Sequence, residues 1–254
     1  MKGHGLPRRS LLAAGGGLVA GGAAGAGLTA AFSVKGQASG QPAWVADEAQ
    51  PSPGEDLMSE HGLLIRILLI YRKLSADHAA GRPVPAEQAQ DAAVIIHDFV
   101  ENFHEELEEA YVFPRVRKAG QFEATISTLL LQHARGRQQT QLILAETGGK
   151  GALAPGPAAR VVGAMDYFVR MYEPHEARED TVIYPAFRSL MTPPEVAELG
   201  AHFAELERQQ FGKSGFPVMV GRVAAIEQAL GIYDLTQFTP PNTTPPNITP
   251  PAAG

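Results

Sequence analysis

A helical motif that occurs twice constrains this chain more than any other feature of its 254 residues. Residues 103–114 and 174–185 share the order His-x-x-x-Glu-acid, followed at identical offsets by an aromatic residue and proline. Residues four apart lie on one face of a helix, so the histidine and the glutamate of each copy point the same way. The copies contain His104 with Glu108, and His175 with Glu179.

A single histidine precedes each copy, on the apolar stripe of the helical segment before it. His61 lies 43 positions before His104, and His133 lies 42 positions before His175. The two halves are therefore related by a shift of 71 or 72 residues, which indicates an internal duplication.

Apolar residues recur at helical spacing between about residues 55 and 190. They divide into four long segments, about 55–79, 86–118, 121–147 and 157–190. Pro114 and Pro185 are expected to kink or end their helices, because each clashes with a carbonyl one turn back. Short connections between long helices favour antiparallel neighbours, so we predict an all-α fold, an up-down-up-down four-helix bundle.

Two shorter helical patterns follow the bundle, near residues 193–208 and 216–230. We expect these extra C-terminal helices, within a region 191–233, to pack on the bundle. Residues 234–254 contain a repeat of Thr, Pro and Asn whose prolines favour an extended, solvated conformation, so this segment is predicted to be a tail.

The N-terminal segment is predicted to be an export signal over residues 1–35, followed by a linker over 36–54. Arg8 and Arg9 stand before Ser-Leu-Leu, and a Gly- and Ala-rich stretch without charges runs from Leu11 to Phe32. This pattern resembles a twin-arginine signal and implies a periplasmic or extracellular protein that is not inserted in a membrane after cleavage. The alternative is an N-terminal membrane anchor, because 22 uncharged residues are long enough to span a bilayer.

Composition restricts the chemistry that this chain can perform. Cysteine is absent, which excludes disulfides, thiolate catalysis and Cys-ligated metals, so any metal must be held by histidine and carboxylates. The formal net charge is −6 and the sequence has no basic stripe, which argues against a nucleic-acid partner. No Gly-rich phosphate loop or nucleophile elbow is present in the sequence.

The repeated motif indicates a metal site in the bundle core. Two carboxylates that face each other in an apolar core repel and are costly to bury unless a positive charge lies between them. A divalent cation supplies that charge, and imidazole with carboxylate suits iron, manganese or zinc.

With these residues in this order, the sequence resembles the hemerythrin family, specifically bacterial proteins with the HHE cation-binding domain, over about residues 55–190. The resemblance implies a non-haem centre of two iron ions, with manganese or zinc as other occupants. It implies that Glu108 and Glu179 bridge the ions while four histidines cap them: His61, His104, His133 and His175. It also implies O2 binding, or related chemistry with NO or peroxide, at an open coordination position.

Two positions depart from the hemerythrin pattern. Oxygen-carrying members have a second histidine one turn after the third-helix histidine, and Arg137 stands there. An arginine cannot ligate a metal, so one ion is expected to be more open unless water, His97 or another residue fills the position. The family spacing also selects Asp180 as the second bridging carboxylate, whereas the internal repeat selects Glu179, which we prefer.

Several other polar residues have plainer interpretations. His97 is expected to be structural or to support a ligand, and His78 and His202 to lie on the surface. Four acidic residues of the second helix are expected to form a solvated face, with one or two supporting the site: Glu101, Glu105, Glu106 and Glu109. Four tyrosines on or near the stripes are mostly packing residues, although one could hydrogen-bond a bound oxygen ligand: Tyr71, Tyr111, Tyr172 and Tyr184.

Three further functions stay open on the sequence alone. The first is an oxidoreductase that turns over peroxide, NO or O2 at the opened iron position. The second is a structural or storage metal site, with zinc as one occupant. The third is a metal-free interaction bundle whose buried polar residues are hydrogen-bonded to one another.

Overall fold

The computed structural model describes residues 51–213 and 215–241. The expected export signal, most of the expected linker and the end of the expected tail lie outside these residues. All secondary structure in the described part of the chain is helical apart from one isolated bridge between Pro85 and Ala152, which confirms the all-α prediction. None of the described helices is long and apolar enough to cross a membrane.

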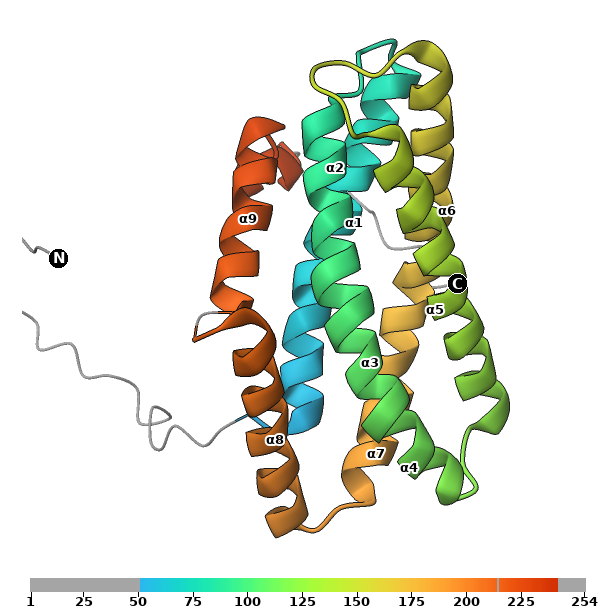
Figure 1. The fold of residues 1–254 in the computed structure, drawn as a ribbon, viewed down its shortest axis with the longest axis vertical. Coiled ribbons are helices and arrows are strands. Elements are labelled where there is room, and N and C mark those ends of the chain that lie inside the picture. The colour runs from blue at the N-terminus through green and yellow to red at the C-terminus, as the bar shows by residue number, and fades with distance from the viewer. Residues whose placement is uncertain (1–50, 214, 242–254) are drawn as a thin grey trace, which may run out of the picture. The chain divides into compact units, whose positions relative to one another are not determined.

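Four long helical segments form the bundle (Figure 1). The first is α1 (Pro53–Ala79) and the third is α5 (Glu123–Glu146). The second runs through α2 (Ala86–Ile95), η1 (Ile96–His104), α3 (Glu105–Leu107), η2 (Glu108–Val112) and α4 (Phe113–Lys118). The fourth runs through α6 (Pro155–Arg178), η3 (Glu179–Ile183) and α7 (Tyr184–Ser189). These extents agree closely with the four segments that apolar periodicity predicts.

The start of α1 is fixed by its own sequence. The side-chain oxygen of Ser52 accepts a hydrogen bond from the Glu55 backbone N–H, and the Glu55 carboxylate accepts one from the Ser52 backbone N–H. This reciprocal capping box satisfies two backbone donors that no helical carbonyl reaches. Pro53 occupies the first turn, where its missing N–H costs nothing.

The long segments pack around a common core. Helix α1 contacts α6 and η1, and α5 contacts α6, α2 and η1, so the second and fourth segments both lie between α1 and α5. Helix α8 (Pro193–Phe211) packs on α1, and α9 (Gly215–Ala229) packs on α1 and α2 (Figure 1). A short 3-10 helix, η4 (Leu235–Phe238), follows α9.

The helices do not end at the two motif prolines. The second segment continues past Pro114 to Lys118, and the fourth continues past Pro185 to Ser189. A π-helical turn precedes each proline, where the N–H groups of Phe113 and Tyr184 donate to carbonyls five residues back. Of the two expected outcomes, a kink or an end, the helices do not end at these prolines, and a wider π-helical turn stands before each proline instead.

One close contact between neighbouring helices requires a glycine. Gly136 in α5 is buried against Tyr172 of α6, and a Cβ atom at position 136 would lie 2.8 Å from the Cε2 atom of that tyrosine ring. The Tyr172 side chain is buried, so it can move aside only by displacing other core residues.

Replacing Gly136 with alanine is therefore expected to lower the free energy of unfolding by about 1–3 kcal/mol, the usual cost of overpacking a core. Urea unfolding of the metal-free protein measures it. Gly163→Ala in α6 is the matched control, because no atom lies within 4 Å of its Cβ position. That change should stabilise the helix by about 0.5–1 kcal/mol. Equal stability of the two variants would contradict the packing argument.

Candidate metal centre

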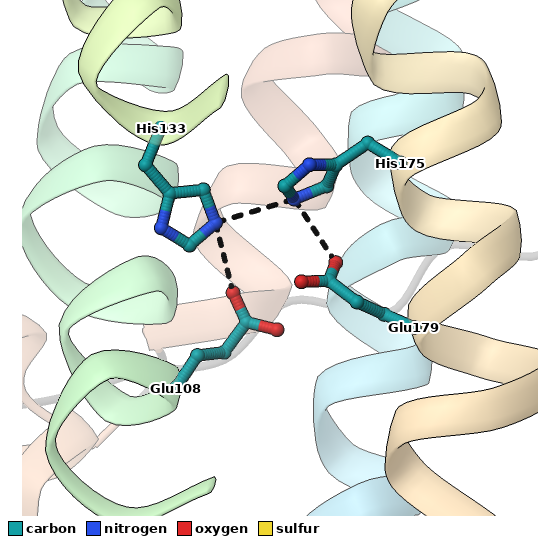
Figure 2. A group of neighbouring side chains, drawn as sticks. All are labelled: Glu108, His133, His175 and Glu179. Atoms are coloured by element: carbon teal, nitrogen blue, oxygen red, sulfur yellow. Dashed lines mark hydrogen bonds and ion pairs between the residues drawn. The ribbon is translucent and has the colours of Figure 1, made fainter. Parts of the chain in front are cut away.

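Six side chains from the four bundle segments converge in the core. Each is buried, with 3% or less of its surface exposed. They come from α1, the junction of η1 and η2, α5, and the junction of α6 and η3: His61, His104, Glu108, His133, His175 and Glu179. Figure 2 shows four of them, from the second, third and fourth segments, directed toward one another.

One group of four donors is formed by Glu108, His133, His175 and Glu179. Their ligand atoms all lie within 4.8 Å of one another. The two Nε2 atoms of His133 and His175 are 3.2 Å apart. His175 Nε2 is 3.1 Å from Glu179 Oε2, and His133 Nε2 is 3.5 Å from Glu108 Oε2 (Figure 2).

A second group contains three donors, His61, His104 and Glu108. The Nε2 atoms of His61 and His104 are 3.1 Å apart, and His104 Nε2 is 3.7 Å from Glu108 Oε2. The two glutamates connect the groups, because Glu179 Oε2 also lies 3.5 Å from His61 Nε2. Each carboxylate therefore faces one histidine of the first group and one histidine of the second group.

The separations fit donors that share an ion. Two donor atoms that bind the same ion at about 2.1 Å lie about 3.0–3.4 Å from each other in octahedral or tetrahedral geometry. Most of the distances above fall in or close to this range. The buried histidine and glutamate groups are therefore compatible with metal binding.

The opposite nitrogen of each histidine is held by a polar side chain. The Nδ1 atoms lie 2.7–3.0 Å from oxygen atoms of Asp180, Glu60, Glu109 and Gln132, which face His61, His104, His133 and His175 in that order. An Nδ1–H that donates to such an oxygen leaves the Nε2 lone pair free, and it fixes the ring orientation. All four imidazoles are thus arranged to present Nε2 to the centre.

These supporting residues follow the internal duplication. Glu60 and Gln132 each stand directly before a lone histidine, and Glu109 and Asp180 each follow a central glutamate. The structure places Glu179 in the donor group and Asp180 behind His61, with Asp180 Oδ1 2.7 Å from His61 Nδ1. Sequence reasoning missed Glu60 and Gln132, although their equivalent places in the repeat could have revealed them.

The charges in the core are poorly balanced by the protein alone. Burial raises the pKa of Glu108 and Glu179 well above the ordinary range of a carboxyl group, and the charge of Glu179 adds to the shift of Glu108. Three buried oxygen atoms have no hydrogen-bond partner: Glu108 Oε2 and both carboxylate oxygens of Glu179. Buried polar atoms are rarely left unpaired, and a cation between the two glutamates would satisfy these.

Burial favours in three of the histidines the neutral form that metal ligation needs. Burial lowers the pKa of His61, holds that of His104 well below its ordinary value, and lowers that of His175 to about 3. A neutral imidazole with Nδ1 engaged is the form that binds a metal through Nε2.

Arg137 is directed at two carboxylates beside the centre. Its guanidinium lies 2.7 Å from Glu105 Oε2 and 2.8 Å from Glu109 Oε1. Glu105 also accepts a hydrogen bond of 2.5 Å from the Tyr172 hydroxyl. Arg137 therefore neutralises charge around His133, because Glu109 binds the arginine and the histidine together.

The prediction that four acidic residues of the second helix form a solvated face is wrong for two of them. Glu101 and Glu105 are buried, whereas Glu106 is exposed and Glu109 is half-buried. Ordinary helical spacing accounts for their burial, since Glu101, His104, Glu105 and Glu108 occupy positions i, i+3, i+4 and i+7 and therefore share one face of the helix.

Glu176 is a buried acid that sequence reasoning did not single out. It occupies the place of Glu105 in the other half, but exposed Ile65 stands where Arg137 would be, and Glu176 Oε1 has no hydrogen-bond partner. Burial, with help from Asp180 and Glu179, raises the pKa of Glu176 to about 9.

The remaining histidines and tyrosines lie outside the two groups or at their edge. His97 is half-buried, and its Nδ1 lies 2.8 Å from Asp98. His202 is exposed and bonds the Tyr111 hydroxyl at 2.9 Å, and His78 is half-buried at the end of α1. Tyr71 and Tyr172 are buried packing residues. Tyr184 reaches the centre itself, with its hydroxyl donating to Glu108 Oε1 at 2.8 Å.

The fold and the buried groups define a helical-bundle protein suited to cation binding, and comparison with known proteins agrees. The hemerythrin HHE cation binding domain matches residues 52–151 and again 126–212. The chain belongs to this family. The two overlapping matches are offset in the same sense as the internal duplication.

Curated relatives come from mycobacteria. The chain is 45% identical over 186 residues to uncharacterized protein Rv1995 of Mycobacterium tuberculosis and to uncharacterized protein Mb2018 of Mycobacterium bovis. The similarity covers 73% of this chain and 73% of each relative. No solved structure matches.

The pKa of Glu176 predicts a pH dependence for the metal-free protein. Folded Glu176 keeps its proton up to about pH 9, while the unfolded carboxyl has the ordinary pKa of 4.5. The folded state therefore binds more protons between these values, and the free energy of unfolding falls as pH rises. The slope from this group is at most about 1.4 kcal/mol per pH unit.

Glu176→Gln should reduce the fall in stability between pH 6.5 and 9, as measured by urea unfolding at several pH values. The lowered pKa of His175 does not affect this slope, because it changes the free energy of unfolding only below about pH 6.5. Exposed Glu106→Gln is the matched control and should keep the wild-type slope. An unchanged slope in Glu176→Gln would contradict the buried, protonated carboxyl.

Proposed function

We propose that this protein is a non-haem di-iron protein of the hemerythrin type that binds O2 or a related small ligand, NO or peroxide. The observation that carries the proposal is the convergence of four histidine Nε2 atoms on two glutamates, three of whose four carboxylate oxygens lack hydrogen-bond partners. We also propose the up-down-up-down helix order of the family for the bundle.

The ligand assignment follows the two groups. His133 and His175 would hold one ion, and His61 and His104 the other. Glu108 and Glu179 would bridge them, since each carboxylate faces a histidine of both groups. Iron in such a site supplies reversible one-electron chemistry and an affinity for small oxygen ligands.

The rest of the chain would keep this site dry and correctly oriented. Four polar side chains hold the histidine rings by Nδ1, and the apolar core excludes bulk water from the Nε2 face. Arg137 supplies no ligand and pairs with Glu105 and Glu109 instead. This supports the proposal of an iron position more open than in oxygen carriers with a histidine there.

The test is metal content together with the visible spectrum of the purified protein, loaded anaerobically with ferrous iron and then exposed to O2. Two irons per chain and a band that appears with O2 and reverses under vacuum would support the proposal. A band that decays irreversibly would favour an oxidoreductase instead. Zinc alone, or no metal, would contradict both.

The double variant His104→Ala with His175→Ala removes one ligand from each proposed ion. We expect it to lose most bound iron, because each ion keeps a single histidine. His78→Ala with His202→Ala is the matched control, since both residues lie outside the donor groups. Circular dichroism checks that both variants stay helical. Unchanged iron content in the first variant would overturn the di-iron assignment.

Export through the N-terminal segment is a separate proposal, supported by Arg8 and Arg9 before the uncharged stretch. Replacing both arginines with lysine keeps the charge but removes the pattern that a twin-arginine signal requires. The variant is expected to stay in the cytoplasm of a host in which the wild type is exported, as fractionation and immunoblotting would measure. Equal export of both proteins would contradict a twin-arginine route.

A further inference from the structure

An aromatic ring stacks on one histidine in each half of the centre. Phe113 stacks on His133 with ring centroids 5.7 Å apart, and Tyr184 stacks on His61 at 5.5 Å. Phe113 and Tyr184 are equivalent in the duplication, and both are buried. Since phenylalanine performs the packing in one half, the hydroxyl of Tyr184 is not needed to fill the other.

The Tyr184 hydroxyl lies among the donor atoms. It is 2.8 Å from Glu108 Oε1 and 3.3 Å from His61 Nε2. Both residues belong to the group with three histidine and glutamate donors, whereas the other group has four. The Tyr184 oxygen therefore lies beside the smaller of the two donor groups.

The distance from the Tyr184 oxygen to His61 Nε2 is similar to the distance between His61 Nε2 and His104 Nε2, so these atoms could bind the same ion. Donors that bind one ion at about 2.1 Å lie about 3.0–3.4 Å apart, and the Tyr184 oxygen meets His61 within that range. The equivalent ring beside His133 is that of Phe113, which carries no hydroxyl. Tyrosine oxygen is an established type of ligand for ferric iron in proteins.

We propose that Tyr184 is a fifth protein ligand, through its phenolate oxygen, of the ion held by His61, His104 and the two bridging glutamates. Binding exchanges the phenol O–H bond for an oxygen–iron bond and releases the proton to solvent, without change of oxidation state. The inference rests on the proposed di-iron function. It makes the two iron positions chemically different, with a phenolate at one and none at the other.

The test is resonance Raman spectroscopy of the full chain, loaded with ferrous iron and oxidised by O2, with excitation in the visible charge-transfer band. We expect phenolate ring vibrations that shift when the protein is made with ring-deuterated tyrosine. Tyr184→Phe should lose them, and Phe113 shows that a ring without a hydroxyl fits this kind of position.

Tyr172→Phe is the matched control. Tyr172 is equally buried and its ring lies 5.0 Å from that of His175, but its hydroxyl donates to Glu105 and belongs to neither donor group. This variant should keep the phenolate vibrations.

Iron content distinguishes failure of the Tyr184 assignment from failure of the proposed di-iron function. Two irons per chain without phenolate vibrations in the wild type would overturn the Tyr184 assignment and leave the di-iron function standing. Vibrations that persist in Tyr184→Phe would also overturn the assignment. Absence of bound iron in the wild type would overturn both proposals. The wild-type measurement with labelled tyrosine decides the assignment even if a variant folds poorly.

Discussion

Two carboxylates, Glu108 and Glu179, are fully buried in the core of a helical bundle. A carboxylate in an apolar interior is costly unless it is protonated or faces a positive charge. No lysine or arginine among the described residues pairs with either of them, while four histidines turn Nε2 toward them. The protein therefore assembles a set of buried donors that is compatible with metal binding.

The duplication explains how this site is built from one repeated pattern. Each half supplies two histidines, one central glutamate and acceptors for Nδ1, at offsets of 71 or 72 residues. The halves differ just outside the donors. Arg137 balances Glu105 in one half while Glu176 has no such partner in the other, and a tyrosine hydroxyl is present on one side only. The two donor groups are therefore nearly equal in their histidines and glutamates but unequal in their surroundings.

Sequence periodicity was sufficient for the parts of the structure that follow a regular helix. The extents of the four segments follow from 3.6-residue spacing, and so does the shared direction of His104 and Glu108, which a single α-helical turn separates. The burial of Glu101 and Glu105 also follows from this spacing, since both share a face with His104 and Glu108, but their charge led us to expect them on a solvated face. Contacts across helices, such as Glu60 with His104, depend on packing that no local pattern contains.

Crystals of the iron-loaded protein would test the central claim most directly, through anomalous diffraction measured on both sides of the iron absorption edge. The di-iron assignment predicts two iron peaks inside the bundle, each about 2.0–2.2 Å from the Nε2 atoms of one histidine pair, with Glu108 and Glu179 between the two peaks. A single peak, peaks at the protein surface, or a core without iron in crystals that contain it would contradict the account.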